Sequence, residues 1–255
     1  MVKASPNGYW LASGDITGKL RVWSFDNPEH LTKLEFPAFA GPIRDVDWDG
    51  ESKKIVVVGD GCSKVITWDT GNTAGDMIGH SKRCLSCSFK ATRPYRIMSC
   101  GEDFKVCFYQ GPPFKMTHSR IPFTNFANCV RYSPNGSHVV CVGEKKIQSF
   151  DGVSGEETLS LPHAHEGTIY SVAWSADSSK FATASADKTV KIWNLALECL
   201  VTHTISSLIG DMQVGVLWGG PKLVSFSLNG NINFLSTEVP GPAAPPVHAH
   251  QVLKL

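Results

Sequence analysis

Two groups of side chains in this sequence contain the types that a hydrolase triad needs. Each group supplies a histidine base, a hydroxyl and a carboxylate in the same chain order: His165, Thr183 and Asp187, and His80, Ser99 and Asp103. Such a triad could activate the hydroxyl for attack on a carbonyl carbon. A catalytic site needs one triad, however, and this grouping recurs at matching places along the chain. We therefore interpret both groups as structural and predict that the protein is not an enzyme.

Three other arrangements have the spacing of metal ligands. Cys84 and Cys87 form a Cys-x-x-Cys pair, but residues three apart on a strand point to opposite faces, and no second pair stands at zinc-ribbon spacing. Two histidine pairs lie two residues apart, which places each pair on one face of an extended segment: His163 with His165, and His248 with His250. They offer at most a weak metal site, because the second histidine of each pair occupies a repeated structural position. We predict no metal and no cofactor.

Aromatic and apolar residues recur along the chain in two series that share one period. The first series closes short alternating strands: Trp23, Trp68, Tyr109, Phe150, Trp193 and Leu235. The second series is offset from the first: Trp48, Phe89, Tyr132, Trp174 and Trp218. Both repeat about every 42 residues, which is the period of WD repeats, the four-stranded blades of a β-propeller.

Each unit is expected to contain the same order of elements. An alternating strand ends at the second-series aromatic, and a polar turn such as Ser133–Gly136 follows. An apolar strand such as Lys180–Ala184 then leads through a tight turn at Asp187 to the first-series strand, and a shorter outer strand returns. No window sustains the period of a helix. We therefore predict an all-β fold, a WD-repeat β-propeller of four-stranded antiparallel blades.

The repeats predict a single domain over residues 1–255 with about six blades of an expected seven. The approximate units are 1–38 (partial), 39–79, 80–122, 123–163, 164–207, 208–249 and 250–255, the last being the start of another unit. The first unit is expected to begin at its second strand, near Tyr9. Because an unclosed propeller would expose strand edges, we expect a fragment or an incomplete gene model. The proline-rich stretch 239–246 is expected to be a stiff connector.

WD repeats commonly join a histidine, a strand Ser or Thr, a turn Asp and a strand aromatic by hydrogen bonds. The resemblance implies two such structural sets: His165, Thr183, Asp187 and Trp193, and His80, Ser99, Asp103 and Tyr109. The remaining units carry other residues at the position of the Asp: Thr17, Cys62, Glu144 and Asn229. We expect those units to depend more on packing.

Composition and charge exclude several classes of partner. The 255 residues are 42% hydrophobic and 18% charged, with a net charge of +1, as in a folded globular protein. No basic cluster points to nucleic acid or to a membrane surface. No apolar stretch approaches the roughly 20 residues of a membrane span, and the first residues lack a signal-peptide core, so we expect a cytoplasmic protein. Most of the 8 cysteines lie in apolar runs and are expected to be buried thiols.

Several segments go beyond the generic repeat and resemble the actin-interacting protein 1 family, a WD-repeat family of two joined seven-bladed propellers. The similarity covers most of that family's first propeller, and these segments carry it: Ala12–Asp15, Gly18–Trp23, Phe39–Asp45, Val57–Gly61, Arg93–Arg96, Gly111–Lys115, Asn128–Pro134 and Ala164–Tyr170. Gly111–Lys115 is the most diagnostic, because a generic repeat has no reason to place two prolines straight after its third strand.

The resemblance implies a function and a location. Members of the family bind actin filaments already decorated with cofilin and promote their disassembly. The resemblance therefore implies that this protein is a non-catalytic binding scaffold in the cytoplasm, at the actin cytoskeleton, with no nucleic-acid, membrane or small-molecule partner. The alternative is a general WD scaffold for another complex, such as a ubiquitin-ligase adaptor or a signalling hub.

Matching the family's contact residues by motif gives five positions: Asp60, Glu102, Lys115, Met116 and Phe126. Asp60 and Glu102 lie near turns between second and third strands and Phe126 in the connection to the next unit, so a meander brings them to one face. Met116 stands where the family commonly has an aromatic residue and Asp60 where it has a longer Glu, so we expect weaker anchoring. The alternative is that these residues have only local structural roles. Lys115 would then be a solvated charge, Phe126 would pack under its own loop, and Asp60 and Glu102 would stabilise their own turns.

Overall fold

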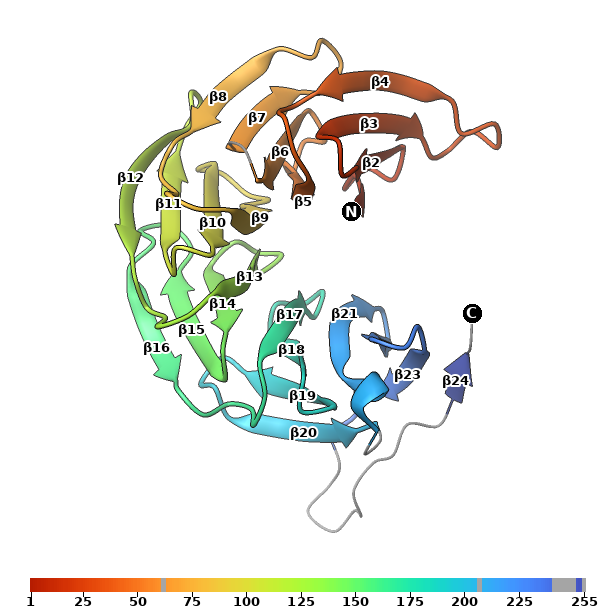
Figure 1. Cartoon of the computed structure of the whole chain (residues 1–255), viewed down its shortest axis with the longest axis vertical. Helices are drawn as coiled ribbons and strands as arrows, with labels where there is room; N and C mark the ends of the chain where they lie inside the picture. Colours follow the sequence, from red (N-terminus) through yellow and green to blue (C-terminus); the bar gives the residue numbers. More distant parts are fainter. Residues whose placement is uncertain (61–62, 206–207, 240–250, 254–255) are drawn as a thin grey trace. The chain divides into compact units, whose positions relative to one another are not determined.

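Six antiparallel sheets of four strands make up the part of the chain that the structure describes (Figure 1). The computed structural model describes residues 1–60, 63–205 and 208–239, and the backbone of 251–253. Over these residues the only helical element is one 3₁₀ turn, η1 (Ile209–Asp211), and none forms a helix that is long and apolar enough to cross a membrane. The predicted all-β fold of four-stranded antiparallel blades is confirmed.

Each sheet is a meander in which strands that follow one another along the chain are neighbours. The strands of the first three sheets are β1 (Val2–Ala4), β2 (Trp10–Gly14), β3 (Lys19–Ser24), β4 (Thr32–Pro37), β5 (Ile43–Trp48), β6 (Lys54–Gly59), β7 (Ser63–Thr67), β8 (Thr73–Met77), β9 (Cys84–Phe89), β10 (Arg96–Gly101), β11 (Val106–Gln110) and β12 (Lys115–Arg120). Those of the last three are β13 (Ala127–Tyr132), β14 (His138–Gly143), β15 (Lys146–Asp151), β16 (Glu157–Leu161), β17 (Ile169–Trp174), β18 (Lys180–Ser185), β19 (Thr189–Asn194), β20 (Cys199–Thr204), β21 (Gln213–Gly219), β22 (Lys222–Ser227), β23 (Ile232–Ser236) and β24 (Gln251–Leu253).

The chain divides into two compact units. The first consists of Met1–Tyr132 with Gly152–Gly155, and the second of Ser133–Asp151 with Glu156–Leu255. In the first unit β5, β9 and β13 are neighbouring inner strands, and β8 and β12 are neighbouring outer strands (Figure 1). A single propeller domain over the whole sequence, with the approximate blade boundaries given above, stays a prediction.

The structure differs from the sequence prediction at both ends. The first blade does not begin at its second strand, because β1 pairs with β2 and places Val2 opposite Ser13. A strand of three residues is too short to show alternation, yet the edge of β2 gains backbone partners from it. Residues Gln251–Leu253 do not open another unit, since β24 pairs with β23 as the fourth strand of the sixth sheet. The predictions on Cys62, residues 240–246, His248 and His250 fall outside the described residues.

The second sheet is buried on both faces, because a neighbouring sheet packs on each. Residues Ile55–Val58 of β6 are all 0% exposed. Ile55 and Val57 belong to a core shared with Leu20 of the first sheet, whereas Val56 and Val58 belong to a core shared with Ile97 of the third. Alternate residues of a strand point to opposite faces. The continuous apolar run of β6 therefore joins three sheets of the first unit.

A buried ion pair connects three inner strands of the first unit, β5, β9 and β13. Arg131 Nη1 on β13 donates to Asp45 Oδ2 on β5 at 2.7 Å and to Ser86 Oγ on β9 at 2.8 Å. The same Asp45 oxygen accepts from Ser86 Oγ at 2.7 Å and from the backbone N–H of Cys87 at 3.1 Å. Burial opposes the charge of Arg131, but Asp45 outweighs it and raises the pKa of Arg131 well above its ordinary value. We call these residues the Asp45–Arg131 network.

Hydrogen bonds link all four residues of one histidine-centred set in the second unit. His165 Nδ1 lies 2.8 Å from Asp187 Oδ2, and His165 Nε2 lies 2.7 Å from Thr183 Oγ1. Trp193 Nε1 donates to the same Thr183 oxygen at 2.8 Å. Burial alone would raise the pKa of Asp187, but bonds from His165 and Thr189 hold it below its ordinary value. Both ring nitrogens of His165 are therefore used inside the sheet.

The matching histidine-centred set in the first unit has the same arrangement, but its last contact, between Ser99 and Tyr109, is longer. His80 Nδ1 and Nε2 lie 2.8 Å from Asp103 Oδ1 and from Ser99 Oγ, respectively. The Ser99 and Tyr109 hydroxyls are 3.4 Å apart, which is long for a hydrogen bond between hydroxyls. The set fixes the β10–β11 turn, because Asp103 also accepts from the backbone N–H of Ser81 at 2.8 Å.

A hydrogen bond between the turns of adjacent sheets recurs in both units. The backbone N–H of Asn7 donates to Ser52 Oγ at 3.1 Å in the first unit, and that of Asn135 donates to Ser178 Oγ at 3.0 Å in the second. Both serines have left-handed backbones, with φ of 56° and 62°. The turns therefore connect neighbouring sheets at a fixed register.

Candidate protein-binding surface

Connections at one end of the sheets carry three of the predicted contact residues of the first unit. Glu102 lies in the β10–β11 turn, Asp60 follows β6, and Phe126 lies in the β12–β13 connection. Because successive strands of a meander run in opposite directions, these connections emerge at the same end. The β8–β9 connection, residues 78–83, emerges there too, and the backbone N–H of Glu102 donates to the carbonyl of Arg83 at 2.9 Å.

Four charged side chains form a continuous series on this surface. Arg44 Nε and Nη2 donate to the two carboxylate oxygens of Asp60 at 2.8 and 3.2 Å. Arg83 Nε lies 3.2 Å from Asp60 Oδ2, and Arg83 Nη1 lies 3.7 Å from Glu102 Oε1. The hydrogen bonds from Arg44 hold the pKa of Asp60 below its ordinary value, although burial opposes them. We call Arg44, Asp60, Arg83 and Glu102 the ion-pair chain.

Phe126 combines exposure with a fixed position beside this chain. Its side chain is 43% exposed, and its ring centroid lies 6.2 Å from that of Phe104. The ammonium group of Lys82 lies 5.5 Å from the centroid of the Phe104 ring, within the range of a cation–π contact. Phe126 therefore packs on the β10–β11 turn with one part of its ring and offers the rest to a partner.

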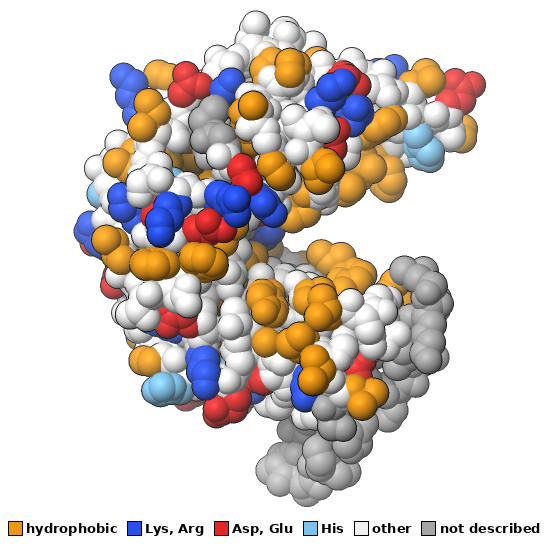
Figure 2. All heavy atoms as spheres, in the orientation of Figure 1, with side chains coloured by type: hydrophobic (Ala, Val, Ile, Leu, Met, Phe, Trp, Pro, Cys, Tyr) orange, Lys and Arg blue, Asp and Glu red, His pale blue; other side chains and the backbone are white. Residues whose placement is uncertain are grey.

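The charged residues surround a shallow hollow. Asp60, Lys82, Arg83 and Glu102 line it together with His80 and Ser81. Figure 2 shows side chains of both charge signs over β9–β11, next to hydrophobic ones. Protein interfaces combine exposed aromatic side chains with polar and charged ones. The arrangement can bind a protein surface.

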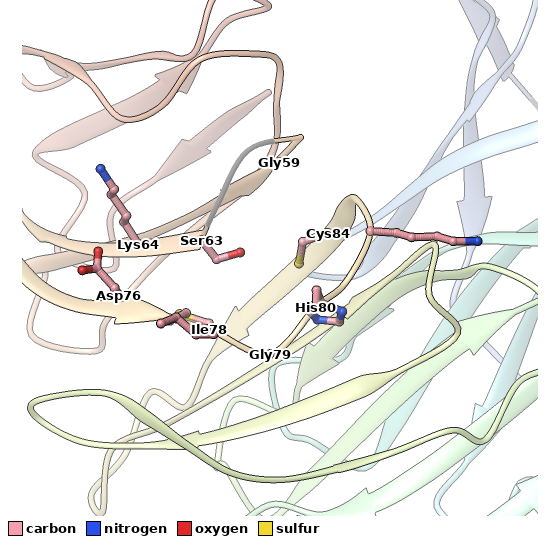
Figure 3. Close-up of a pocket in the computed structure, with 10 residues that line it drawn as sticks. Gly59, Ser63, Lys64, Asp76, Ile78, Gly79, His80 and Cys84 are labelled. Atoms are coloured by element: carbon pink, nitrogen blue, oxygen red, sulfur yellow. The ribbon is translucent and has the colours of Figure 1, made fainter.

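Met116 lies on β12 at the edge of this surface and is 42% exposed. A Cβ atom on Gly79 would lie 2.8 Å from Met116 Sδ, so Met116 packs against the β8–β9 connection. The neighbouring Ile78 is 81% exposed. It borders a pocket of 450 Å³ that Figure 3 shows between Asp76 on one side and Cys84 on the other. A partner side chain has room to enter there.

Lys115 lies elsewhere. It pairs with Gln110 at the start of β12, beside the 111–114 turn, and therefore at the opposite end of the third sheet from Glu102. The structure brings Asp60, Glu102 and Phe126 together, places Met116 at their edge and separates Lys115 from them. Lys115 is the basic residue that the family motif predicts for this surface. The basic residues found there are Arg44, Lys82 and Arg83 instead.

Sequence reasoning did not single out the partners that complete the surface: Arg44, Lys82, Arg83, Phe104 and Ile78. The arginines resemble ordinary solvated charges, because a strand period does not show that connections from different sheets converge. One signal was available at Phe104, a bulky residue directly after the repeated Asp103 in a tight turn. Its backbone has φ of 68°, a conformation in which a large side chain is uncommon.

The arrangements with metal-ligand spacing are occupied by structural contacts. Cys84 and Cys87 are 2% and 0% exposed, and burial raises the pKa of Cys84 to about 12, so the thiolate that a metal needs is disfavoured. His163 is exposed, whereas the ring nitrogens of His165 are engaged by Asp187 and Thr183. Over the described ranges, no group of three or more His, Cys, Asp or Glu side chains is placed to hold a metal ion. The described cysteines are buried apart from Cys199.

Comparison with known proteins agrees with the repeat architecture. The profile of the WD domain, G-beta repeat, matches residues 2–24 and 155–194. The chain therefore contains WD repeats over these two segments. Two relatives named WD repeat-containing protein 1, from Gallus gallus and Mus musculus, are 42% and 40% identical to this WD-repeat chain over 94% and 98% of its length. The protein named actin-interacting protein 1 from Drosophila melanogaster is 37% identical over 98% of it.

These identities confirm the resemblance that the sequence segments indicated. The alignments cover 41%, 42% and 42% of the three relatives, so the WD-repeat chain spans about two fifths of their length. What the relatives do as whole proteins therefore enters below as a proposal for this chain.

Proposed function

We propose that this WD-repeat chain binds actin filaments decorated with cofilin and promotes their disassembly, as a binding scaffold without catalytic activity. The observation that carries the proposal is Phe126, an exposed aromatic ring fixed on Phe104 beside the ion-pair chain. The relative named actin-interacting protein 1 supplies the class of partner. The proposed location is the cytoplasm, at the actin cytoskeleton.

The proposed contact residues would contribute in different ways. Phe126, 43% exposed, would supply the main apolar contact, since aromatic side chains buried in an interface dominate binding energy, and Met116, 42% exposed, would add apolar contact at the edge. Asp60 and Glu102 would contact the partner from the rim, where charges affect register and association rate more than affinity. Because Arg44 and Arg83 are already held by carboxylates, they would lose little side-chain entropy on binding. Lys115 would contact only a partner that extends along β12.

Dependence on cofilin implies a composite target. A filament decorated with cofilin presents cofilin surfaces beside those of actin, which the bare filament lacks. A surface that needs an apolar contact at Phe126 and charged contacts at the ion-pair chain can require both proteins at once. Disassembly would follow if the chain binds a dissociating state of the decorated filament more tightly than the intact one.

Co-sedimentation with actin filaments, with and without cofilin, tests the proposal. We expect the chain to pellet only with cofilin and to shorten filaments observed by microscopy. Phe126→Ala should lower the affinity about tenfold or more, whereas Lys33→Ala, on exposed β4, should leave it unchanged. Absence of cofilin-dependent pelleting by a folded chain would contradict the proposal and favour a general WD scaffold.

A further inference from the structure

A groove at the other end of the first unit's sheets unites two sequence segments that the proposed interface does not use. Its lining comes from the β5–β6, β9–β10 and β11–β12 turns and includes Glu51, Lys54, Arg93, Pro94, Tyr95 and Pro112. It therefore joins the Arg93–Arg96 segment to the Gly111–Lys115 segment. Because β10 runs from Arg96 to Gly101, the groove and the Glu102 turn lie at opposite ends of one sheet. We call it the basic groove.

The groove carries an excess of positive charge that its own carboxylate does not balance. Glu51 accepts from Arg93 Nη2 and from Lys53 Nζ, each at 3.0 Å, and from the Tyr95 hydroxyl. The donation from Tyr95, followed by those from Arg93 and Lys53, lowers the pKa of Glu51 to about 2. Lys54 lies 3.8 Å from the buried carboxylate of Asp49. The three cations Lys53, Lys54 and Arg93 therefore outnumber the two carboxylates by one. Arg93 is 77% exposed and keeps further N–H donors of its guanidinium directed to solvent.

A buried lysine stabilises the loop that carries Arg93. Lys90 is 3% exposed, and its ammonium group donates to the carbonyls of Thr92 and Arg93 at 3.0 and 3.3 Å. The guanidinium of Arg93 also lies 5.3 Å from the centre of the Tyr95 ring, so stacking supports it. A cation held in this way loses little freedom when an anion binds.

Apolar surface lies directly beside these cations. Pro94 and Pro112 are exposed and Tyr95 is half-buried, and all three line the groove. Proline rings and a tyrosine face form a shallow floor that suits an aliphatic or proline side chain. The groove thus offers two kinds of contact within one span: an ion pair at the exposed Arg93, with the charge of Lys54 beside it, and apolar contact at the floor.

We propose that the basic groove is a second docking site, which takes an acidic segment of a partner protein with an apolar or proline residue next to its carboxylate. The charge excess selects the acidic residue, and the proline and tyrosine floor selects its neighbour. Since the site lies away from Phe126 and the ion-pair chain, it can be occupied while the proposed filament interface is in use. It would let the chain recruit an acidic partner independently of actin.

Fluorescence anisotropy of the full chain with a fluorescein-labelled peptide of repeating Glu-Pro-Leu units tests this proposal. We expect saturable binding that weakens with salt, because exposed ion pairs are screened. A peptide with Gln for Glu, and one with Ser for Pro and Leu, should each bind about tenfold more weakly or worse. Equal binding of the Gln peptide, or no saturable signal from the Glu-Pro-Leu peptide, would overturn the proposal.

Variants of the chain locate the binding. Arg93→Glu and Lys54→Glu should each lower affinity for the Glu-Pro-Leu peptide about tenfold, while Lys33→Glu, an equal change of charge on exposed β4, should not. Thermal unfolding should be nearly the same for Arg93→Glu and Lys33→Glu, whereas Lys54→Glu also removes the cation 3.8 Å from buried Asp49 and should lower the Tm. Arg93→Glu should also leave cofilin-dependent pelleting intact, which separates this site from the proposed function. Equal losses of peptide binding in Lys33→Glu and Arg93→Glu would show that net charge alone attracts the peptide.

Discussion

Two of the places in the first unit where acidic and basic side chains pair differ in burial, and burial separates what those pairs do. In the Asp45–Arg131 network the carboxylate is 3% exposed and the arginine 20%. In the ion-pair chain Asp60 is 17% exposed and Arg83 is 54% exposed. Removal of a partner leaves an unpaired charge in a poorly solvated interior in the first case, whereas water replaces the partner in the second. The same residue types therefore hold the inner strands together in one place and form an accessible surface in the other.

Removal of Arg131 should produce the largest loss. Arg131→Met leaves Asp45 buried without its cation, so we expect the free energy of unfolding to fall by about 3–5 kcal/mol. Arg83→Met should cost at most about 1 kcal/mol, since exposed pairs contribute little. Urea unfolding followed by tryptophan fluorescence measures both variants. Similar losses would remove the distinction between the two pairs.

Loss of one buried hydroxyl oxygen from a histidine-centred set should lower the free energy of unfolding by an intermediate amount. In Thr183→Val, His165 Nε2 and Trp193 Nε1 both lose their partner, and we expect a loss of about 2 kcal/mol. Ser99→Ala should cost less, because the Tyr109 hydroxyl is already 3.4 Å from Ser99. Thr204→Val, on the exposed side of β20, is the matched control for a lost hydroxyl. An equal effect in all three would argue against a structural role for the shared oxygen.

A fall in pH should reduce the stability contributed by the histidine-centred set around Asp187 more than that contributed by the ion-pair chain. The pKa of Asp187 lies below its ordinary value in the folded chain, because bonds from His165 and Thr189 outweigh the opposing effect of burial. The unfolded chain then binds protons more readily, so stability present above about pH 4 is lost as the pH falls. In Asp187→Asn the decline of Tm between about pH 5 and about pH 2 should be shallower. Asp60→Asn should change that slope only slightly, and a larger change there would contradict the comparison.

Lys115 should give the smallest effect. Lys115→Ala removes an exposed charge at the far end of the third sheet, so the free energy of unfolding should change by less than about 0.5 kcal/mol. We expect the variant to pellet with cofilin-decorated filaments better than Phe126→Ala does. A loss equal to that of Phe126→Ala would mean that the partner reaches along β12, and the proposed interface would have to include that strand.

Much of the fold is readable from the sequence, because strand-ending aromatics such as Trp68 and Trp193 recur with one period. The family motif proposes Phe126 and Glu102 as contact residues, since the motif covers contiguous residues. Arg83 is not, because its role depends on Asp60 and Glu102 from two other connections, and local periodicity carries no information on such convergence. The short strands β1 and β24 escape prediction for a related reason: each is defined by the edge that it pairs with rather than by its own pattern.

The hydrogen bonds from Asn7 to Ser52 and from Asn135 to Ser178 bear on how such a chain could grow by duplication. The donor is a backbone N–H, which every non-proline residue supplies, so only the serine acceptor has to be selected. The corresponding turn positions in the donor turns are Gly8 and Gly136, with φ of 76° and 73°, which accept the left-handed backbone without strain. A duplicated four-stranded sheet would therefore already contain the backbone donor of the hydrogen bond to the next sheet.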